Sequence, residues 1–244
     1  VQQPLYSTLP NAEEMKLIPG CKNIKIASRT NQRIIMLNKG ADDKGFMVCK
    51  DCGAAMPGDD IAVLKNIERP YKLRFAKSKC RHANTFNVNL GYDFITDMLV
   101  LEFTIDDKVI DVRRKDNPWL SRAAQSLAEA LRLVASKKLD VEFTELVTGY
   151  RLRTGSEASY IDIYLYDSLS SGAGYAVSVA DSITDLLADV REMLSACDCG
   201  AACSKCLKHY RNQFVHGKLD RFAALQLLKL GVDGKKASPL NVAT

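Results

Sequence analysis

The hydrophobic and polar positions of this chain repeat with two different periods, which predicts both helices and strands. From 118 to 134, apolar residues recur at three- and four-residue spacing, the pattern of a helix with one apolar stripe. Asn117 fits the N-cap of that helix, and Pro118 fits its first position, where a missing N–H costs nothing. From 160 to 166, apolar residues alternate with polar or aromatic ones, as in a strand.

Predicted strands and helices continue to alternate over most of the rest of the chain. Short apolar runs predict a small β-meander, and longer runs rich in β-branched residues predict further strands. The last helix is expected to begin after Asp220 and to end at Gly231. The fold class is therefore α+β or α/β, with a mixed sheet flanked by helices. The other predicted elements are strands at 24–26, 34–37, 46–48, 93–105 and 141–152, and a helix at about 176–194.

Four cysteines lie within ten residues near the C-terminus: Cys197, Cys199, Cys203 and Cys206. Four thiolates gathered by a tight turn suit a tetrahedral zinc ion, with Zn–S distances of about 2.3 Å. The alternatives are buried free thiols or two local disulfides, and disulfides at this spacing would be strained. A site closed by four thiolates leaves no position for an activated water, so its expected role is to stabilise a C-terminal helical segment.

A second candidate metal site lies upstream. Cys49 and Cys52 form a C-x-x-C-G knuckle, and Cys80 with His82 would complete a Cys3His zinc site. A redox C-x-x-C is the rival interpretation, but the βαβ context of such motifs is missing here. We therefore expect Zn2+ as the cofactor, with two ions per chain. Cys21 is expected to be a small core residue, or else a metal ligand.

These features divide the chain into four predicted segments. An arm or linker at 1–20 precedes a small β-rich zinc-knuckle subdomain at 21–84. An α/β domain with the four-cysteine site follows at 85–231, and a tail occupies 232–244.

Composition narrows the class of protein. The hydrophobic fraction of 47% and the charged fraction of 26% are ordinary for a soluble globular protein. No apolar run approaches the roughly 20 residues that span a bilayer, so no membrane partner is expected. Clustered cysteines without a secretory signal favour the reducing cytoplasm. Val1 in place of an initiator Met suggests a piece excised from a longer protein.

The net charge of +5 is unevenly distributed. Basic residues are in excess at 61–82 and again at 203–236, beside the two cysteine groups. Such an excess is expected where a protein binds the phosphates of DNA, although a basic solvated surface would look the same. The candidate phosphate contacts are Lys72, Arg74, Lys77, Lys79, Arg81, Lys205, Lys208 and Arg211.

A glycine loop between a predicted strand and a predicted helix is a candidate anion site. It runs from Asp167 through Gly172 and Gly174, and backbone amides at such a position can hold a phosphate. A tight turn that uses glycine for steric reasons is the simpler interpretation, with Asp167 capping the loop. The alternative function is a nuclease or nucleotide-processing domain that uses Asp167 and Asp162. His209 and His216 are interpreted as surface or phosphate contacts.

With these motifs identified, the second half of the chain resembles the MrfA-type zinc-binding domain, or MZB domain. The resemblance covers roughly 85–231 and more loosely 45–53. Its specific parts are 93–97, 164–175, the four-cysteine cluster, 206–212 and 219–224. The family's loop usually carries a Pro-Gly-Gly-Ala-Gly run, whereas Ser170 and Ser171 replace its first two residues here.

The resemblance implies a zinc-binding accessory domain that helps a DNA helicase to engage DNA. Such domains occur at the C-terminus of superfamily 2 helicases that act in DNA repair, and in phage-defence proteins such as DrmB of the DISARM system. The partners implied are DNA and a helicase, either in the same chain or as a separate subunit. Helicase motifs are absent here, so ATP hydrolysis would belong to other sequence, and the chain does not look like a complete enzyme. A protein-interaction module of a defence or repair complex is a further alternative.

Overall fold

The structure is a computed structural model that describes residues 3–6, 14–67, 80–105, 118–155 and 158–235. The chain divides into two compact units. The smaller comprises 1–7 and 33–94, and the larger comprises 8–32 and 95–244. The units interleave along the sequence because two strands, β3 (Ile24–Asn38) and β7 (Leu90–Ile105), each contribute residues to both. The segment boundaries predicted at residues 20, 84 and 231 stay predictions.

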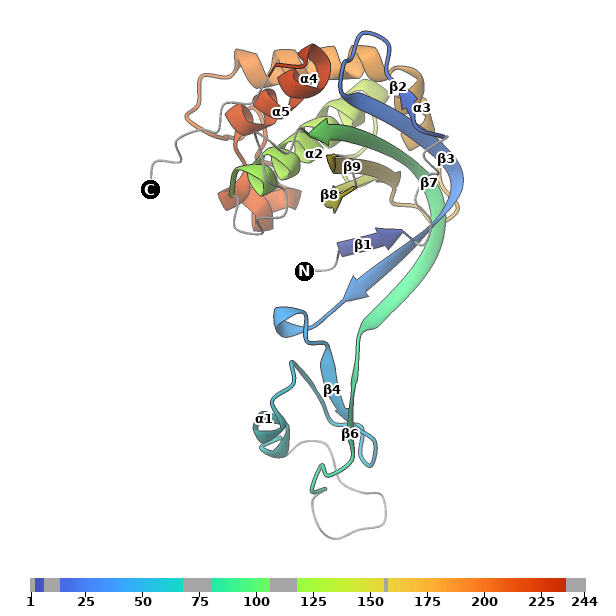
Figure 1. The fold of residues 1–244 in the computed structure, drawn as a ribbon, viewed down its shortest axis with the longest axis vertical. Helices are drawn as coiled ribbons and strands as arrows, with labels where there is room; N and C mark the ends of the chain where they lie inside the picture. Colours follow the sequence, from blue (N-terminus) through green and yellow to red (C-terminus); the bar gives the residue numbers. More distant parts are fainter. Residues whose placement is uncertain (1–2, 7–13, 68–79, 106–117, 156–157, 236–244) are drawn as a thin grey trace. The chain divides into compact units, whose positions relative to one another are not determined.

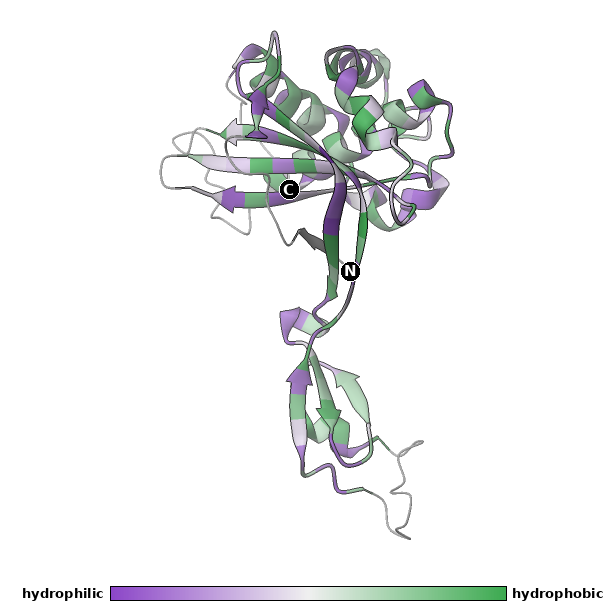
Figure 2. Ribbon diagram, turned by 90° about the vertical axis from the view of Figure 1, so that its right-hand side faces the viewer, coloured by the Kyte–Doolittle hydropathy of each residue, from purple (hydrophilic) through white to green (hydrophobic). Residues whose placement is uncertain are grey.

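An antiparallel sheet organises the larger unit. Strand β9 (Ser159–Asp167) pairs with β7 on one side and with β8 (Leu146–Thr154) on the other. Strand β2 (Lys16–Leu17) pairs with the beginning of β3. Because side chains alternate across a strand, Leu101 and its register partner Ile163 both enter the hydrophobic core. Figure 2 shows this alternation of hydrophobic and hydrophilic residues along the strands.

Helices cover one face of this sheet (Figure 1). Helix α2 (Pro118–Leu139) lies against β8 and β9, and helices α4 (Ile183–Ala196) and α5 (Arg221–Asp233) pack on α2. Helix α3 (Tyr175–Asp181) follows β9, and a 3₁₀ helix, η3 (Tyr210–Lys218), precedes α5. The stripe predicted on α2 is fully buried, as are its counterparts on α4 and α5. Burial of these stripes supplies most of the hydrophobic stabilisation of the unit.

Gly231 does not end the last helix, so that prediction was wrong. Helix α5 runs on to Asp233, and Gly234 caps it in the left-handed conformation with φ of 66°. A Cβ on Gly231 would lie 2.5 Å from Cγ1 of Ile24 and 2.6 Å from Cε1 of Phe103. Glycine at this position therefore permits the close packing of α5 on the sheet.

Several other predicted elements have different boundaries in the structure. The strand predicted at 141–152 is β8, Leu146–Thr154, because the chain turns at 143–145. The separate runs at 24–26 and 34–37 belong to one 15-residue strand, β3. The helix predicted at 176–194 is divided at Ser182 into α3 and α4, because Ser182 has non-helical backbone angles (φ −114°, ψ 26°).

The smaller unit contains a three-stranded antiparallel sheet. Strand β4 (Phe46–Cys49) lies between β5 (Ala55–Pro57) and β6 (Thr85–Val88), and the short helix α1 (Ile61–Lys65) follows β5. Strand β1 (Gln3–Tyr6) pairs with the end of β3, and a single 3₁₀ turn, η2 (Ala41–Asp43), follows β3. The core of this sheet is small and consists of Met47, Cys49, Ala54, Met56 and Leu64.

The predicted fold class is confirmed: the chain has sheets, helices packed against them, and cysteine clusters in its N-terminal and C-terminal parts. Among the described helices, none is both long and apolar enough to cross a membrane.

Candidate metal centres

The C-terminal cluster brings four sulfur atoms to the distances of a tetrahedral metal site. Sγ of Cys197 lies 3.5 Å from that of Cys203, and Sγ of Cys206 lies 3.6 Å from that of Cys199 and 3.9 Å from that of Cys203. A tetrahedron with Zn–S bonds of about 2.3 Å has sulfur–sulfur edges of about 3.8 Å. The four cysteines are unbridged and all four sulfurs lie within 4.8 Å of one another, so the donor set fits zinc.

The backbone around Cys203 forms the turn that gathers these sulfurs. Cys197 is the C-cap residue of α4, and there the chain leaves the helix in an extended conformation. The carbonyl of Cys203 accepts hydrogen bonds from the amides of Cys206, Leu207 and Lys208 at 2.9–3.2 Å. The amide of Cys203 in turn donates to Sγ of Cys206 at 3.3 Å. Cys206 is 1% exposed, so the turn is anchored in the hydrophobic core.

Hydrogen bonding within the turn lowers the pKa of one thiol. The amide of Lys205 and the neighbouring cysteines bring the pKa of Cys203 to about 7. Burial raises the pKa of Cys206 to about 12. Metal ligation requires thiolates, and the lowered pKa means that Cys203 supplies one more readily than Cys206 does.

Arg221, at the start of α5, braces the cluster from outside the four sulfurs. Its Nε donates to the carbonyl of Cys199 at 2.8 Å, and Nη1 donates to the carbonyl of Leu194 at 3.0 Å. Its backbone amide also donates to the carbonyl of Ala201 at 2.8 Å. The buried guanidinium thus joins the end of α4, the cysteine loop and α5. From the sequence, Arg221 was counted among the basic residues of 203–236 and within the family-like ending at 219–224, and this bracing role was not predicted.

The N-terminal cluster in the smaller unit has comparable geometry. Sγ of Cys49 lies 3.7 Å from Sγ of Cys80, and Sγ of Cys52 lies 3.4 Å from Nδ1 of His82. All four candidate ligand atoms lie within 4.8 Å of one another. A zinc ion with three thiolates and one imidazole has edges of roughly 3.6–3.8 Å, so these residues also fit zinc.

A tight turn and a strand pair position these ligands. The amide of Gly53, with φ of 77°, donates to the carbonyl of Cys49 at 2.9 Å and closes the knuckle. Across the sheet, Cys49 pairs in register with Thr85 of β6, which comes three residues after His82 in the chain. The strand pair therefore brings Cys49 close to the second pair of ligands. His82 is 3% exposed. Burial raises the pKa of Cys49, but hydrogen bonds from His82 and nearby amides outweigh it and bring that pKa to about 7.

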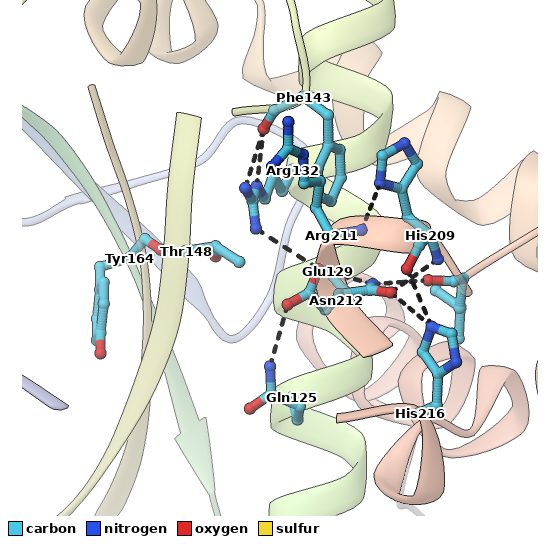
Figure 3. Close-up of polar contacts among 11 residues, drawn as sticks. Gln125, Glu129, Arg132, Phe143, Thr148, Tyr164, His209, Arg211, Asn212 and His216 are labelled. Carbon is cyan, nitrogen blue, oxygen red and sulfur yellow. Dashed lines mark hydrogen bonds and ion pairs between the residues drawn. The ribbon is translucent and has the colours of Figure 1, made fainter. Parts of the chain in front are cut away.

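Asn212 connects the C-terminal cluster to the core helix α2 (Figure 3). Its Nδ2 donates to Oε2 of Glu129 at 3.0 Å and to the carbonyl of Leu207 at 2.9 Å, directly after Cys206. Its Oδ1 accepts from the amide of His209 at 2.7 Å and contacts Nε2 of His216 at 2.9 Å. Asn212 is 1% exposed and Glu129 is 3% exposed, so the network is buried.

Both histidines of this region are half-buried and have structural contacts, and their interpretation as surface or phosphate contacts stays a prediction. His209 stacks on the ring of Phe143 with a centroid separation of 4.2 Å, and its Nδ1 accepts from the amide of Arg211 at 3.1 Å. The guanidinium of Arg132 also lies against the Phe143 ring, 3.8 Å from its centroid. Figure 3 shows these side chains converging between α2 and η3. No local pattern marked this network, because Glu129 lies on the polar side of α2, at helical spacing from Gln125 and Arg132.

The candidate anion loop is filled by carboxylates of the chain itself. Asp167 is fully buried, and its oxygens accept hydrogen bonds from the amides of Ala173, Tyr175 and Ala176 at 2.6–3.1 Å. Oδ2 of Asp97 accepts from the amide of Gly174 at 3.0 Å. Asp167 therefore caps the loop here, and these amides already have acceptors.

Asp162, the second carboxylate of the nuclease alternative, is also fully engaged. It is 0% exposed and lies 2.7 Å from Nη2 of Arg151 and 2.5 Å from Nε of Arg153. Arg153 also pairs with Glu102 at 2.5 Å. These ions tie β7, β8 and β9 together on the sheet face opposite the helices, and they do not converge with Asp167.

The predicted phosphate contacts are only partly within the described residues. Lys205 and Arg211 are exposed, Lys208 is half-buried, and Arg81 is exposed in the smaller unit. Lys205 also lines an open hollow of about 530 Å³ beside the four cysteines, together with Met193 and Ser204. Four of the predicted contacts lie outside the described residues: Lys72, Arg74, Lys77 and Lys79.

An α+β unit closed by a four-cysteine cluster is typical of a zinc-binding domain, and comparison with known families agrees. Residues 127–207 match the model of the MrfA Zn-binding domain, MZB. The resemblance stated from the sequence is therefore confirmed, over the part of the larger unit that this match covers.

Two longer proteins resemble the chain over nearly all of its length. Druantia protein DruE from Escherichia coli (strain UMEA 4076-1) is 35% identical over 243 residues, which cover 94% of this chain and 13% of DruE. The crystal structure of the DUF1998 helicase MrfA bound to DNA aligns with a TM-score of 0.55 and 13% identity. That alignment covers 94% of this chain and 24% of MrfA, and it shows likeness of fold alone.

Proposed function

We propose that this chain is a zinc-stabilised accessory module that holds DNA phosphates for a DNA helicase or a phage-defence protein. One observation carries the proposal: the MZB segment ends in a four-cysteine cluster followed directly by a basic surface segment. From Cys203 to Leu219 the chain has four lysine or arginine residues and no aspartate or glutamate. We call residues 203–219 the basic segment.

The four basic side chains of the basic segment outweigh the negative charge beside them, which is the net −2 of a zinc ion held by four thiolates and the exposed Asp198. Two further carboxylates near the basic segment have other partners, since Glu129 is buried against Asn212 and Asp220 caps helix α5. Lys205 and Arg211 are exposed to solvent. An exposed cluster of cations attracts a polyanion, and the release of counterions from DNA then contributes to affinity.

The role proposed for zinc is to stabilise the fold. With four thiolates as ligands, the ion would have no open position for substrate, and its binding contributes to folding. The turn at Cys203 and the brace from Arg221 connect the ion directly to the start of the basic segment. The chain spans only a small part of its relatives, so ATP hydrolysis and translocation are assigned to a helicase domain elsewhere in the same chain or in a partner.

The salt dependence of DNA binding tests this proposal. The zinc-loaded chain is titrated with labelled DNA by fluorescence anisotropy at several salt concentrations. We expect the logarithm of affinity to fall linearly with the logarithm of salt concentration, with a slope of about −0.7 to −0.9 per phosphate held. Affinity that stays flat from low to moderate salt would overturn the proposal.

Charge-removal variants locate the binding surface. Replacing Lys205, Lys208 or Arg211 with alanine is expected to reduce the magnitude of the slope by roughly one for each phosphate that the variant no longer holds. Lys138→Ala is the matched control, because it removes one cation from α2 of the same unit, where Lys138 pairs with Asp189 at 2.8 Å. A slope that changes equally in the control and in the three variants would show that the basic segment is not the binding surface.

A further inference from the structure

Two aromatic side chains stand out of the basic segment into solvent. Tyr210 and Phe214 are each 77% exposed, the largest exposed fractions among the large hydrophobic side chains of the described residues. Single exposed hydrophobic residues are common, but here two largely exposed aromatic rings lie within five residues of the chain.

Buried contacts on the inward side of η3 hold these aromatics outward. His209, the N-cap of η3, stacks on Phe143, Asn212 is bonded to Glu129 and Val215 is 9% exposed, so all three contact the protein. Tyr210 and Phe214 lie between them in sequence, on either side of a kink at Asn212, and both side chains are exposed. The segment is rigidly anchored, so little conformational freedom remains to be lost when a ligand binds.

The charge around the aromatics selects the class of ligand. Arg211 lies between them in sequence and is exposed, as is Lys218 at the end of η3. Alternating cations and exposed aromatic rings suit a ligand with both negative charge and flat apolar faces. Single-stranded nucleic acid has both, because unpaired bases stack on aromatic side chains while Lys or Arg holds the backbone. Bases in a duplex are already stacked and cannot do so without unpairing.

We infer that Tyr210 and Phe214 form a base-stacking platform that gives this chain a preference for single-stranded over duplex DNA. The inference rests on the proposed function, since Lys205, Lys208 and Arg211 supply the phosphate contacts beside the platform. To the proposed function it adds a preference for single-stranded DNA, and it adds two binding residues that the charge pattern alone does not indicate. The aromatic rings bind bases of any sequence, so little sequence preference is expected.

Alanine substitution of the two aromatics tests the inference. Binding of the zinc-loaded full chain is measured with fluorescein-labelled oligothymidine and with a labelled duplex of the same length. Tyr210→Ala or Phe214→Ala is expected to weaken oligothymidine binding by roughly 5- to 150-fold for a stacked base and to leave duplex binding nearly unchanged. Leu169→Ala removes another exposed apolar side chain of the larger unit and is expected to change neither affinity.

A tryptophan reporter gives a readout that does not depend on affinity. Trp119 is the only tryptophan of the chain and is 5% exposed, so it contributes a constant background. Phe214→Trp is expected to retain oligothymidine binding and to lose fluorescence when a base stacks on the indole. Leu169→Trp places an indole at an exposed site outside the platform, and its fluorescence is expected to stay unchanged.

Failure of the inference and failure of the proposed function give different results. If the wild-type chain binds neither DNA, the proposed function fails. If it binds DNA but both alanine variants keep full oligothymidine affinity, or lose duplex affinity equally, the stacking platform is overturned while phosphate binding stands. Aromatic-dependent binding of a polyglutamate peptide without aromatic-dependent binding of oligothymidine would make this surface a protein-docking site and would also overturn the inference.

Discussion

The amide of Asn212 donates a 3.0 Å hydrogen bond to the carboxylate of Glu129, a residue 83 positions earlier in the chain. This bond joins the segment that follows the four-cysteine cluster to the central helix α2. Both side chains are buried, so neither can exchange its partner for water. The position of η3, and with it the exposed basic and aromatic residues, depends on this contact.

Asn212→Ala is therefore expected to destabilise the larger unit. The substitution removes one donor from the Glu129 carboxylate, which keeps Gln125 and Arg132, and takes the Asn212 partner from the Leu207 carbonyl and the His209 amide. A lost hydrogen bond to a charged group costs about 1.5–3 kcal/mol. The free energy of unfolding from urea titration measures this loss. Gln213→Ala, at the exposed neighbouring position, should change that free energy by less than about 0.5 kcal/mol. Equal effects at the two positions would show that the network contributes nothing.

Arg221→Met is expected to weaken metal retention without altering a ligand. The methionine preserves much of the side-chain volume but donates no hydrogen bond to the carbonyls of Cys199 and Leu194. Loss of such outer contacts typically lowers metal affinity 10- to 100-fold. Competition with a chromogenic zinc chelator measures this affinity. Arg211→Met removes an exposed arginine near the same cluster and should leave zinc affinity as in the wild type.

Two glycines of the Asp167 loop should differ in their response to alanine. A Cβ at Gly172 would lie 2.3 Å from Oδ2 of Asp97, whereas a Cβ at Gly174 would meet no atom within 4 Å. Both have positive φ, so alanine at either position costs about 1–2 kcal/mol of backbone strain. Gly172→Ala adds overpacking of about 1–3 kcal/mol, because Asp97 is buried and bonded to Gly174. Thermal unfolding should rank Gly172→Ala as the less stable variant, and the reverse order would contradict the close approach of Asp97 to Gly172.

The elements that were predictable from the sequence are those with an uninterrupted period. The apolar stripe of α2 and the alternation of β9 are local patterns, and both elements occur where they were expected. Strand β3 was divided in the prediction because its middle, 28–33, is polar and partly exposed, which resembles a loop in sequence. The break at Ser182 carries no glycine or proline to mark it.

The C-terminal metal site could be predicted because its four ligands are close in sequence. The residues that hold the cluster in place are far apart in sequence and could not be predicted. The spacing of Cys197, Cys199, Cys203 and Cys206 is itself the zinc signature. Glu129 and Asn212 are brought together only by the packing of η3 on α2, and no local pattern encodes that contact. The assignment of Gly231 failed for the same reason, since its close neighbours Ile24 and Phe103 come from distant strands.

Metal content should separate the two candidate centres. We expect about two zinc ions per chain, one for each set of four ligands. Cys206→Ser should lower the content to about one, because removing a thiolate from a four-thiolate site breaks the closed shell. Cys49→Ser should also leave about one, with the C-terminal ion retained.

Cys21→Ala is the control for this measurement, because Cys21 is a buried cysteine outside both clusters and its loss should leave the zinc content unchanged. Mass spectrometry of metals in the purified chain decides between these outcomes. One zinc in the wild type that survives Cys49→Ser but not Cys206→Ser would leave the N-terminal knuckle as a structural turn without metal.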